Sequence, residues 1–543
     1  MTSYATAADG AERASLTTWA AVLGALLGAF MAVLNIQITN ASLLYIEGGI
    51  GTGVDNGTWI STAYLIGEII VIPMTDYLTR VFSFRRFLIT NGVLFLAFSV
   101  ACAFAHNLMQ MIALRALQGF TGGVLIPMAF TMILTKLPKP QQPLGLALFA
   151  ITATFAPAIG PTIGGYLTEA YGWQYVFFVN VVPGAAMVTV LWLTLEREPM
   201  RLDMLGGGDW FGIATMAVGL AALQTVLDEG NKDDWFDSPF IVRLTAAAAT
   251  SLALFIWIEL RSAEPIVNFR LLANRNFGFG SLAVFFLGFA LYGTVYLLPE
   301  YLGQVFGYNA EQIGFVLAWT GLPQLVIIPF VPLLMKRIDP RLITICGLLV
   351  FAFSCFMNAH LSPDYSGNQL WLPNIVRAVG QAVILAPLSA IALGGIAKQD
   401  SAAASGLFNM MRNLGGAFGT ALLATLVTKR EQFHSNVIGS AVNLFRSSVR
   451  ERLADLTGYF LSHGVSDAAA AQYKAIVALG NIVRRQALIM GYADTFAALA
   501  LLLTVAAASL LFTRRVGASG VAAQVTEQRV TPRRARYNST PEH

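Results

Sequence analysis

Long apolar runs, separated by short polar loops, occupy most of this chain. A helix needs about 20 consecutive apolar residues to cross a lipid bilayer, and about fourteen runs reach that length. Their approximate limits are 17–39, 57–79, 86–105, 109–134, 143–168, 173–195, 209–228, 240–260, 277–299, 310–335, 341–360, 369–396, 402–428 and 487–513. The pattern predicts an all-α polytopic membrane protein with fourteen transmembrane helices.

The fifth run contains the sequence A-P-A-I-G-P-T-I-G-G. Small residues recur at every fourth position and therefore share one face of the predicted helix: Ala156, Gly160 and Gly164. The adjoining face carries Pro157, Pro161 and Gly165. Prolines remove backbone donors and bend a helix, while small residues let a neighbouring backbone approach closely. We expect a kinked helix packed tightly against a partner helix; the alternative is a general packing seam of small residues.

Composition agrees with a membrane protein and argues against other classes. Of the 543 residues, 56% are hydrophobic and 12% are charged, whereas soluble domains carry about twice that charged fraction. The basic residues lie in short loops and a tail, which argues against a nucleic-acid-binding surface. The three cysteines lie in apolar runs as buried apolar residues, and the five histidines are scattered. With no G-x-x-x-x-G-K-[ST] sequence either, we expect no ATP-driven step, no metal, no cofactor and no enzymatic activity.

Charge is divided unequally between the two sets of loops. One set is basic and carries Arg80, Arg85, Arg86, Lys136, Lys139, Arg197, Arg201, Arg261, Arg270, Arg275, Lys336, Arg337, Arg341 and Lys398. The other set holds Glu47, Asp55, Glu169, Asp364 and the acidic stretch 228–237. Because basic loops remain in the cytoplasm, this bias predicts that both termini are cytoplasmic.

A weak internal repeat suggests the domain organisation. Arg115 precedes Pro127 in the fourth run as Arg377 precedes Pro387 in the twelfth, which is typical of transporters built from repeats. We predict two six-helix bundles at 17–200 and 271–515, joined by two extra helices at 201–270. Cytoplasmic tails occupy 1–16 and 516–543, and 428–486 forms a long external loop with helical periodicity at 442–461 and 468–482.

The motifs of this chain resemble those of a known transporter family. The stretch 156–165 is similar to the antiporter motif of the major facilitator superfamily, 115–123 to its fourth-helix motif, and 173–184 to its sixth-helix signature. Segments 227–236 and 405–416 resemble the fourteen-helix drug:proton antiporter branch, of the EmrB/QacA type. The resemblance covers about residues 19–515. It implies alternating access between two six-helix halves, a gating role for the fifth helix and a proton-transfer role for Arg115.

Two departures from the family pattern bear on the mechanism. In the loop after the second run, Asp76 and Ser83 occupy glycine positions and Arg80 occupies an acidic position, while Arg85 and Arg86 follow the pattern. The usual charge interactions of this loop are therefore in question. In the first run, Asn35 replaces the aspartate that the branch uses for proton or cation handling.

Few ionisable residues lie inside the apolar runs: Glu68, Arg115, Arg377, Arg412 and Asp494. A charge at the membrane centre costs about 2.5–3.5 kcal/mol on insertion scales, so each is a functional hypothesis. Low dielectric favours the protonated form of a carboxyl group, so we expect Glu68 to replace the missing first-run acid as the proton-coupling site, assisted by Arg115. The alternative for both is a structural role, and this alternative is favoured for Arg377 and Arg412.

Polar and aromatic residues at mid-run positions are candidates for a substrate cavity, which is generally apolar with a few polar groups. They are Asn35, Gln37, Tyr64, Phe155, Tyr292, Tyr296, Trp319, Gln324 and Asn409, with Arg412 beside the last of them. As a set they suit a planar, amphipathic or aromatic substrate. Each aromatic residue taken singly is equally compatible with packing in the bundle.

The leading hypothesis is a proton-coupled exporter of amphipathic small molecules in a bacterial inner membrane. The resemblance also implies a possible periplasmic adaptor and outer-membrane channel as partners. Departures at Asn35, Asp76 and Glu68 leave open a dedicated transporter of one metabolite, such as a vitamin. A membrane sensor or scaffold without transport is a third alternative.

Overall fold

The computed structural model describes residues 14–52, 57–207, 209–262, 265–397 and 400–514, all of which form helices or their connections. The predicted terminal tails, apart from the last few residues before the first helix, and Lys398 lie outside these ranges. The first half contains α1 (Leu16–Ala41), α2 (Leu43–Ile50), α3 (Thr58–Phe82), α4 (Phe84–Ala103), α5 (Leu108–Lys136), α6 (Gln142–Tyr171), α7 (Tyr175–Phe178) and α8 (Val181–Thr194). Two further helices follow, α9 (Trp210–Glu229) and α10 (Pro239–Arg261).

The second half repeats the pattern of long helices. It contains α11 (Arg275–Phe306), α12 (Ala310–Ile327), α13 (Val331–Arg337), α14 (Pro340–Asn358), α15 (Trp371–Ala382), α16 (Leu385–Leu393), α17 (Ser401–Ala441), α18 (Ser447–Ser462) and α19 (Ala468–Ser509). Short 3₁₀ helices connect or end several of them, namely Leu202–Gly207, Trp235–Asp237, Phe269–Ala273, Ile328–Phe330 and Leu510–Phe512.

The predicted all-α membrane fold is confirmed. Within the described ranges, twelve helices or helix pairs are long and apolar enough to cross a membrane, and α6, whose two parts bend by 47°, makes a thirteenth. The polar helix α17 is not among them, yet it packs against α3, α5, α11 and α19 in the same bundle. Counting α17, every predicted run coincides with a helix or a broken helix, which is consistent with fourteen spans.

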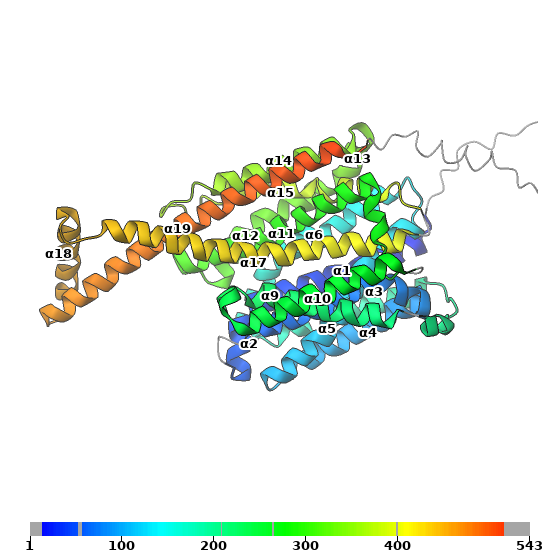
Figure 1. Cartoon of the computed structure of the whole chain (residues 1–543), viewed down its shortest axis with the longest axis horizontal. Coiled ribbons are helices and arrows are strands. Elements are labelled where there is room, and N and C mark those ends of the chain that lie inside the picture. The colour runs from blue at the N-terminus through cyan, green and yellow to red at the C-terminus, as the bar shows by residue number, and fades with distance from the viewer. Residues whose placement is uncertain (1–13, 53–56, 208, 263–264, 398–399, 515–543) are drawn as a thin grey trace, which may run out of the picture.

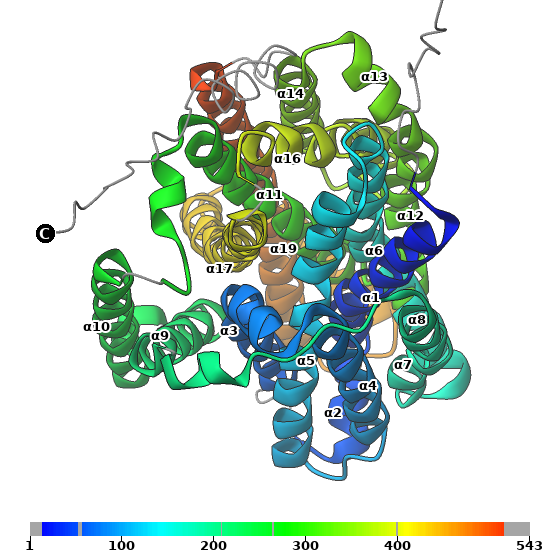
Figure 2. The same ribbon diagram turned by 90° about the vertical axis from the view of Figure 1, so that its right-hand side faces the viewer.

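The two halves meet along two seams (Figure 2). In one seam α6 packs on α12, and in the other α3 and α5 pack on α17. The pair α9–α10 lies at the periphery, where α9 contacts α3 and α17. The described ends of the chain lie at the same end of the bundle, since Arg514 N donates to Asn276 Oδ1 at 2.8 Å and α1 begins beside the α5–α6 loop.

The helix α6 is kinked and closely packed, as the sequence predicts. Its bend falls between Pro157 and Ile159, where the prolines interrupt the backbone hydrogen bonds. A Cβ atom at Gly164 would lie 2.7 Å from the carbonyl oxygen of Ile38, so only glycine permits this approach of α6 to α1. On its other side Thr162 packs against Gly314 of α12. The helix therefore touches both halves.

Residues 428–486 form a helical projection, not the loop that the sequence predicts. The helices α17 and α19 continue well beyond the rest of the bundle, and α18 joins their outer ends (Figure 1). Where the two long helices leave the bundle, Asp494 of α19 accepts hydrogen bonds from Arg430 Nε at 2.6 Å and His434 Nε2 at 2.7 Å. The expected helical periodicity at 442–461 and 468–482 coincides largely with α18 and the start of α19.

The cysteines depart in one respect from their expected burial. Cys102 and Cys355 are buried, but Cys346 lies on an exposed face of α14. An exposed apolar face is the expected surface of a helix that contacts lipid.

Candidate functional site

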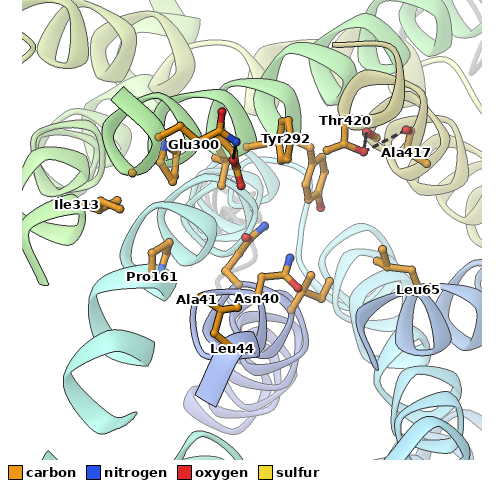
Figure 3. A pocket seen from close by; sticks show the side chains of 18 of the residues that line it. Asn40, Ala41, Leu44, Leu65, Pro161, Tyr292, Glu300, Ile313, Ala417 and Thr420 are labelled. Atoms are coloured by element: carbon orange, nitrogen blue, oxygen red, sulfur yellow. Dashed lines mark hydrogen bonds between the residues drawn. The ribbon is translucent and has the colours of Figure 1, made fainter. Parts of the chain in front are cut away.

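A cavity of about 550 Å³ lies between the two halves. The first half contributes residues of α1, α2, α3 and α6, the second half residues of α11, α12 and α17, and α9 adds Gln224. Figure 3 shows Glu300 and Tyr292 of α11 on one side of the cavity and Asn40 and Leu44 on the opposite side. Because both halves form its walls, a relative movement of the halves would change its access.

The cavity opens at the end of the bundle away from the described chain ends. Its outermost lining residues are Leu44 and Tyr45 in α2 and Tyr308 and Asn309 before α12. At the opposite end α3 and α5 pack against α17, and α6 packs against α16. A space of about 10 Å³ lies there, beside Asp76 and Gly406. Among the described residues, the cavity therefore opens at one end of the bundle, and the helices of the two halves pack together at the other end.

Glu68 lies at the inner end of this cavity and is 3% exposed. Its Oε1 atom accepts a hydrogen bond from Asn413 Nδ2 of α17 at 2.8 Å, so the bond joins the two halves. Its Oε2 atom is buried and has no hydrogen-bond partner among the described residues. Arg412 and Arg115 lie near enough for their charges to act on the carboxyl group. Glu68 is thus the buried ionisable group at the contact between the halves.

Arg115 is fully buried behind the cavity and does not line it. Its Nη1 atom donates to Asn35 Oδ1 at 2.5 Å and to Gln118 Oε1 at 2.7 Å, and its Nε atom donates to the carbonyl oxygen of Ile60 at 3.2 Å. The guanidinium carbon lies 4.3 Å from the centre of the Tyr64 ring. The sequence-predicted residues Asn35, Tyr64 and Arg115 therefore form one buried cluster that joins α1, α3 and α5.

The second half contains an equivalent arginine cluster. Arg377 of α15 donates to Thr320 Oγ1 of α12, as Arg115 of α5 donates to α3 in the first half. Nearby, Gln324 Nε2 donates to Gln381 Oε1 at 3.0 Å. The internal repeat read from the sequence thus has a structural counterpart. The described neighbours of Arg377 include no carboxylate that acts on it, in contrast to Arg115.

Only three of the predicted cavity residues line the cavity, namely Gln37, Tyr292 and Tyr296. The expectation does not hold in this structure for Asn35, Tyr64, Phe155, Trp319, Gln324, Asn409 and Arg412. Their side chains have other surroundings: Phe155 stacks on Phe30, Asn409 donates to the carbonyl oxygen of Ser405, and Trp319 is 49% exposed on the outer face of α12. Arg412 is buried beside Phe149, and its guanidinium group has no hydrogen-bond partner within the described chain.

The antiporter-motif residues of α6 pack against α1 beside the cavity. Gly160 packs against the Gln37 side chain, Gly164 packs against Ile38, and Pro161 lines the cavity. Pro157 and Gly165 are buried within the bundle. The motif therefore places Pro161, which follows the bend of α6, in the cavity wall.

The loop after α3 has charge interactions of its own. Arg80 donates to Asp76 at 3.1 Å within the same helix, so two of the three residues that depart from the family pattern here pair with each other. Arg85 donates to the carbonyl oxygen of Trp192 at 2.7 Å and lies over its ring, whereas Arg86 is exposed. The start of α4 therefore binds α8 through Arg85.

Several cavity residues were not among the sequence-predicted candidates: Asn40, Glu300, Gln304, Tyr308 and Asn413. Tyr292, Tyr296, Glu300 and Gln304 recur at every fourth position of α11 and form a polar stripe along the cavity wall. This four-residue spacing of polar residues is visible in the sequence and indicates one face of a helix. It was missed because the apolar run appeared to end at residue 299, while the helix extends to Phe306.

The family model of the Major Facilitator Superfamily matches residues 25–420. This chain belongs to that superfamily. It is 32% identical to the colistin resistance protein EmrB of Acinetobacter baumannii over 92% of this chain and 97% of that protein. It is 31% identical to the multidrug export protein EmrB of Escherichia coli K12, over 80% of this chain and 84% of that protein. The fatty acid resistance protein FarB of Neisseria gonorrhoeae is 31% identical over 87% of this chain and 91% of its own length.

A solved structure supports the fold independently. The human organic anion transporter MFSD10 superposes with a TM-score of 0.55 at 15% identity, over 90% of this chain and 99% of that one. At this identity the likeness concerns the fold alone. The family match and the relatives above confirm the predicted superfamily and the EmrB-type branch, and they make this chain a membrane-embedded transporter.

Proposed function

We propose that this chain is a proton-coupled exporter of amphipathic or aromatic small molecules, which works by alternating access. The observation that carries the proposal is the hydrogen bond between Glu68 and Asn413, because it joins the two halves through an ionisable group at the end of the cavity. The names of the EmrB relatives, which describe multidrug export and colistin resistance, support the export of small molecules.

The geometry gives a direction to the coupling. An ionised carboxylate accepts stronger hydrogen bonds than a neutral carboxyl group, and it is also attracted to Arg412. A proton that enters through the open cavity and binds Glu68 weakens both interactions with α17. The halves can then separate at the end that is closed in this structure. Release of the proton on that side restores the contact, so one proton moves inward as the cavity changes sides.

The roles of the neighbouring residues follow from their positions. Arg115 holds Asn35, Gln118 and α3 in place and adds a positive charge behind Glu68. In α6, Gly160, Pro161 and Gly164 let the cavity wall bend against α1 as the halves move. Gln37, Tyr292 and Tyr296 would contact the substrate.

We place the protein in a bacterial inner membrane with both chain ends in the cytoplasm. Arg80, Arg85 and Arg341 lie at the end of the bundle that holds the described chain ends, in agreement with the positive-inside rule. The cavity then opens to the exterior. On that side the projection of α17, α18 and α19 exposes Phe445 and Tyr473, a surface suited to contact with a periplasmic adaptor that leads to an outer-membrane channel.

The proposal is tested in proteoliposomes with an imposed pH gradient. We expect the wild type to transport several dissimilar lipophilic dyes against their gradients, and Glu68→Gln to lose the gradient-driven flux. The matched control is Glu311→Gln, since Glu311 is exposed at the start of α12 and does not line the cavity. Full proton-driven flux in Glu68→Gln would refute the coupling role. Saturable transport of one metabolite, without inhibition by dyes, would instead identify a dedicated transporter.

A further inference from the structure

The charged side chains that line the cavity all have the same sign. Its two charged residues are both acidic, Glu68 and Glu300, and no lysine, arginine or histidine of the described ranges lines it. Most of the remaining polar surface consists of amide groups and tyrosines. An anionic substrate would therefore face two carboxylates without a cationic partner, whereas a cation would find partners at the wall.

Glu300 differs from Glu68 in its surroundings. It lies nearer to the mouth of the cavity than Glu68 does, close to the C-terminal end of α11. It belongs to the polar stripe of α11 together with Tyr292 and Tyr296. Glu68 has Arg412 and Arg115 behind it, but the one side chain that interacts favourably with the Glu300 carboxylate within the described chain is Gln304. The negative charge of Glu300 is thus available to a ligand.

The carboxylate of Glu300 is held in position by a chain of hydrogen bonds. Tyr492 Oη of α19 donates to Gln304 Oε1 at 3.1 Å, which leaves the Gln304 amide nitrogen to donate to Glu300 Oε2 at 2.6 Å. Tyr292 and Tyr296 line the same wall. Aromatic rings attract organic cations, and desolvated bulky cations gain more from this contact than small hydrated ones. At the inner end of the cavity, the buried Oε2 atom of Glu68 has no partner of its own.

We propose that the cavity selects organic cations with a large apolar or aromatic body, and that Glu300, positioned by Gln304 and Tyr492, is the residue that recognises their charge. The inference rests on the proposed transport function and names its substrate class. It assigns recognition to α11 in the second half, and it leaves proton coupling to Glu68 in the first half. A ligand cation and a proton would therefore act on different carboxylates of one cavity.

Two ions of the same shape and opposite charge test this selection. We would measure equilibrium binding of tetraphenylphosphonium and of tetraphenylborate to the purified full chain in nanodiscs, with empty nanodiscs as the blank for partition into lipid. We expect the wild type to bind the cation at least tenfold more tightly than the anion. In Glu300→Gln, cation affinity falls about tenfold and anion affinity is unchanged or rises. Tyr492→Phe gives a smaller loss for the cation alone.

The control Glu311→Gln, which removes the same charge outside the cavity, leaves both affinities unchanged. A misfolded variant would lose both ligands, so a selective loss of the cation cannot come from unfolding. Equal wild-type affinities for the two ions, or unchanged cation affinity in Glu300→Gln, would overturn the proposal. Binding is measured without a pH gradient, so its outcome is separate from that of the transport test. Gradient-driven flux of the cation that is unchanged in Glu300→Gln would refute this inference alone. Cation binding without flux would refute the transport function alone.

Discussion

The hydrogen bond between Asn413 and Glu68 leads to a quantitative prediction for Asn413→Ala. In the conformation described here the bond is 2.8 Å long, and the Glu68 side chain is 3% exposed. The other carboxylate oxygen already lacks a partner, so the substitution leaves both oxygens of a buried carboxylate without one. A hydrogen bond to a charged group contributes about 1.5–3 kcal/mol. When Glu68 is ionised, the substitution should therefore lower the equilibrium constant for the open-cavity conformation by a factor of about 10 to 160.

Spin labels on the two halves report this equilibrium. Gly48 of α2 and Glu311 of α12 are exposed, lie on different halves and do not line the cavity. Cys346 is the one exposed native cysteine to replace in the described chain. Double electron–electron resonance should show a large distance in the wild type at high pH. The fraction with a short distance should increase as Glu68 is protonated, because the bond to Asn413 weakens. In Asn413→Ala the short distance should already predominate at high pH, with little further change on acidification.

Asn409→Ala is the matched control for this experiment. Asn409 is an asparagine one turn earlier in α17, and it donates to the carbonyl oxygen of Ser405 in its own helix, so its loss breaks no bond between the halves. The distance between the spin labels in Asn409→Ala should therefore depend on pH as it does in the wild type. The reasoning would be refuted if Asn413→Ala had the same distribution as the wild type at every pH, or if Asn409→Ala gave an equal shift.

Two further predictions concern packing and the projection. Gly164→Val should lower the free energy of unfolding of the purified protein by about 1–3 kcal/mol, because the valine side chain would meet the Ile38 carbonyl oxygen. The control Gly480→Val places its side chain in open space and should not change the stability. Thermal unfolding in detergent compares the two variants, and equal melting temperatures would contradict the close approach of α6 to α1. Asp494→Asn should increase amide hydrogen exchange in α18 and the outer parts of α17 and α19 by a few-fold, because the half-exposed contacts with Arg430 and His434 contribute at most about 1 kcal/mol. Asp455→Asn, within α18, is its control, and unchanged exchange in Asp494→Asn would show that this carboxylate does not hold the projection.

The positions of the helices followed from the sequence because lipid imposes a simple requirement. Each span must satisfy its own backbone groups and present about 20 apolar residues, so hydropathy marks its limits. The kink of α6 was predictable for a similar reason, since Pro157 and Pro161 act through their own backbone. The extension of α17 was not, because the same polar residues suit either a loop or a helix in water.

The site residues were harder to predict because hydropathy does not show which way a polar side chain faces. Asn35 and Gln324 are mid-span polar residues, as a cavity would require, yet they bind Arg115 and Gln381 inside their own half. Polar side chains inside a membrane bundle form hydrogen bonds with one another, and those without such a partner can face the cavity. Glu300 faces it, and sequence analysis missed this residue because it lies one position beyond the apparent end of an apolar run.

The comparison of the two arginine clusters indicates where coupling must take place. Both halves use a buried arginine to join neighbouring helices, but only Arg115 acts together with a carboxylate, Glu68. The first half can therefore respond to a proton, whereas the second half supplies Asn413 and the stripe of α11 with Glu300. If protons bind Glu68 and ligand cations bind Glu300, the two do not compete for one carboxylate. The two must be linked through the movement of α3 against α17, so substitutions in that seam should change the coupling of flux to the gradient more than they change binding.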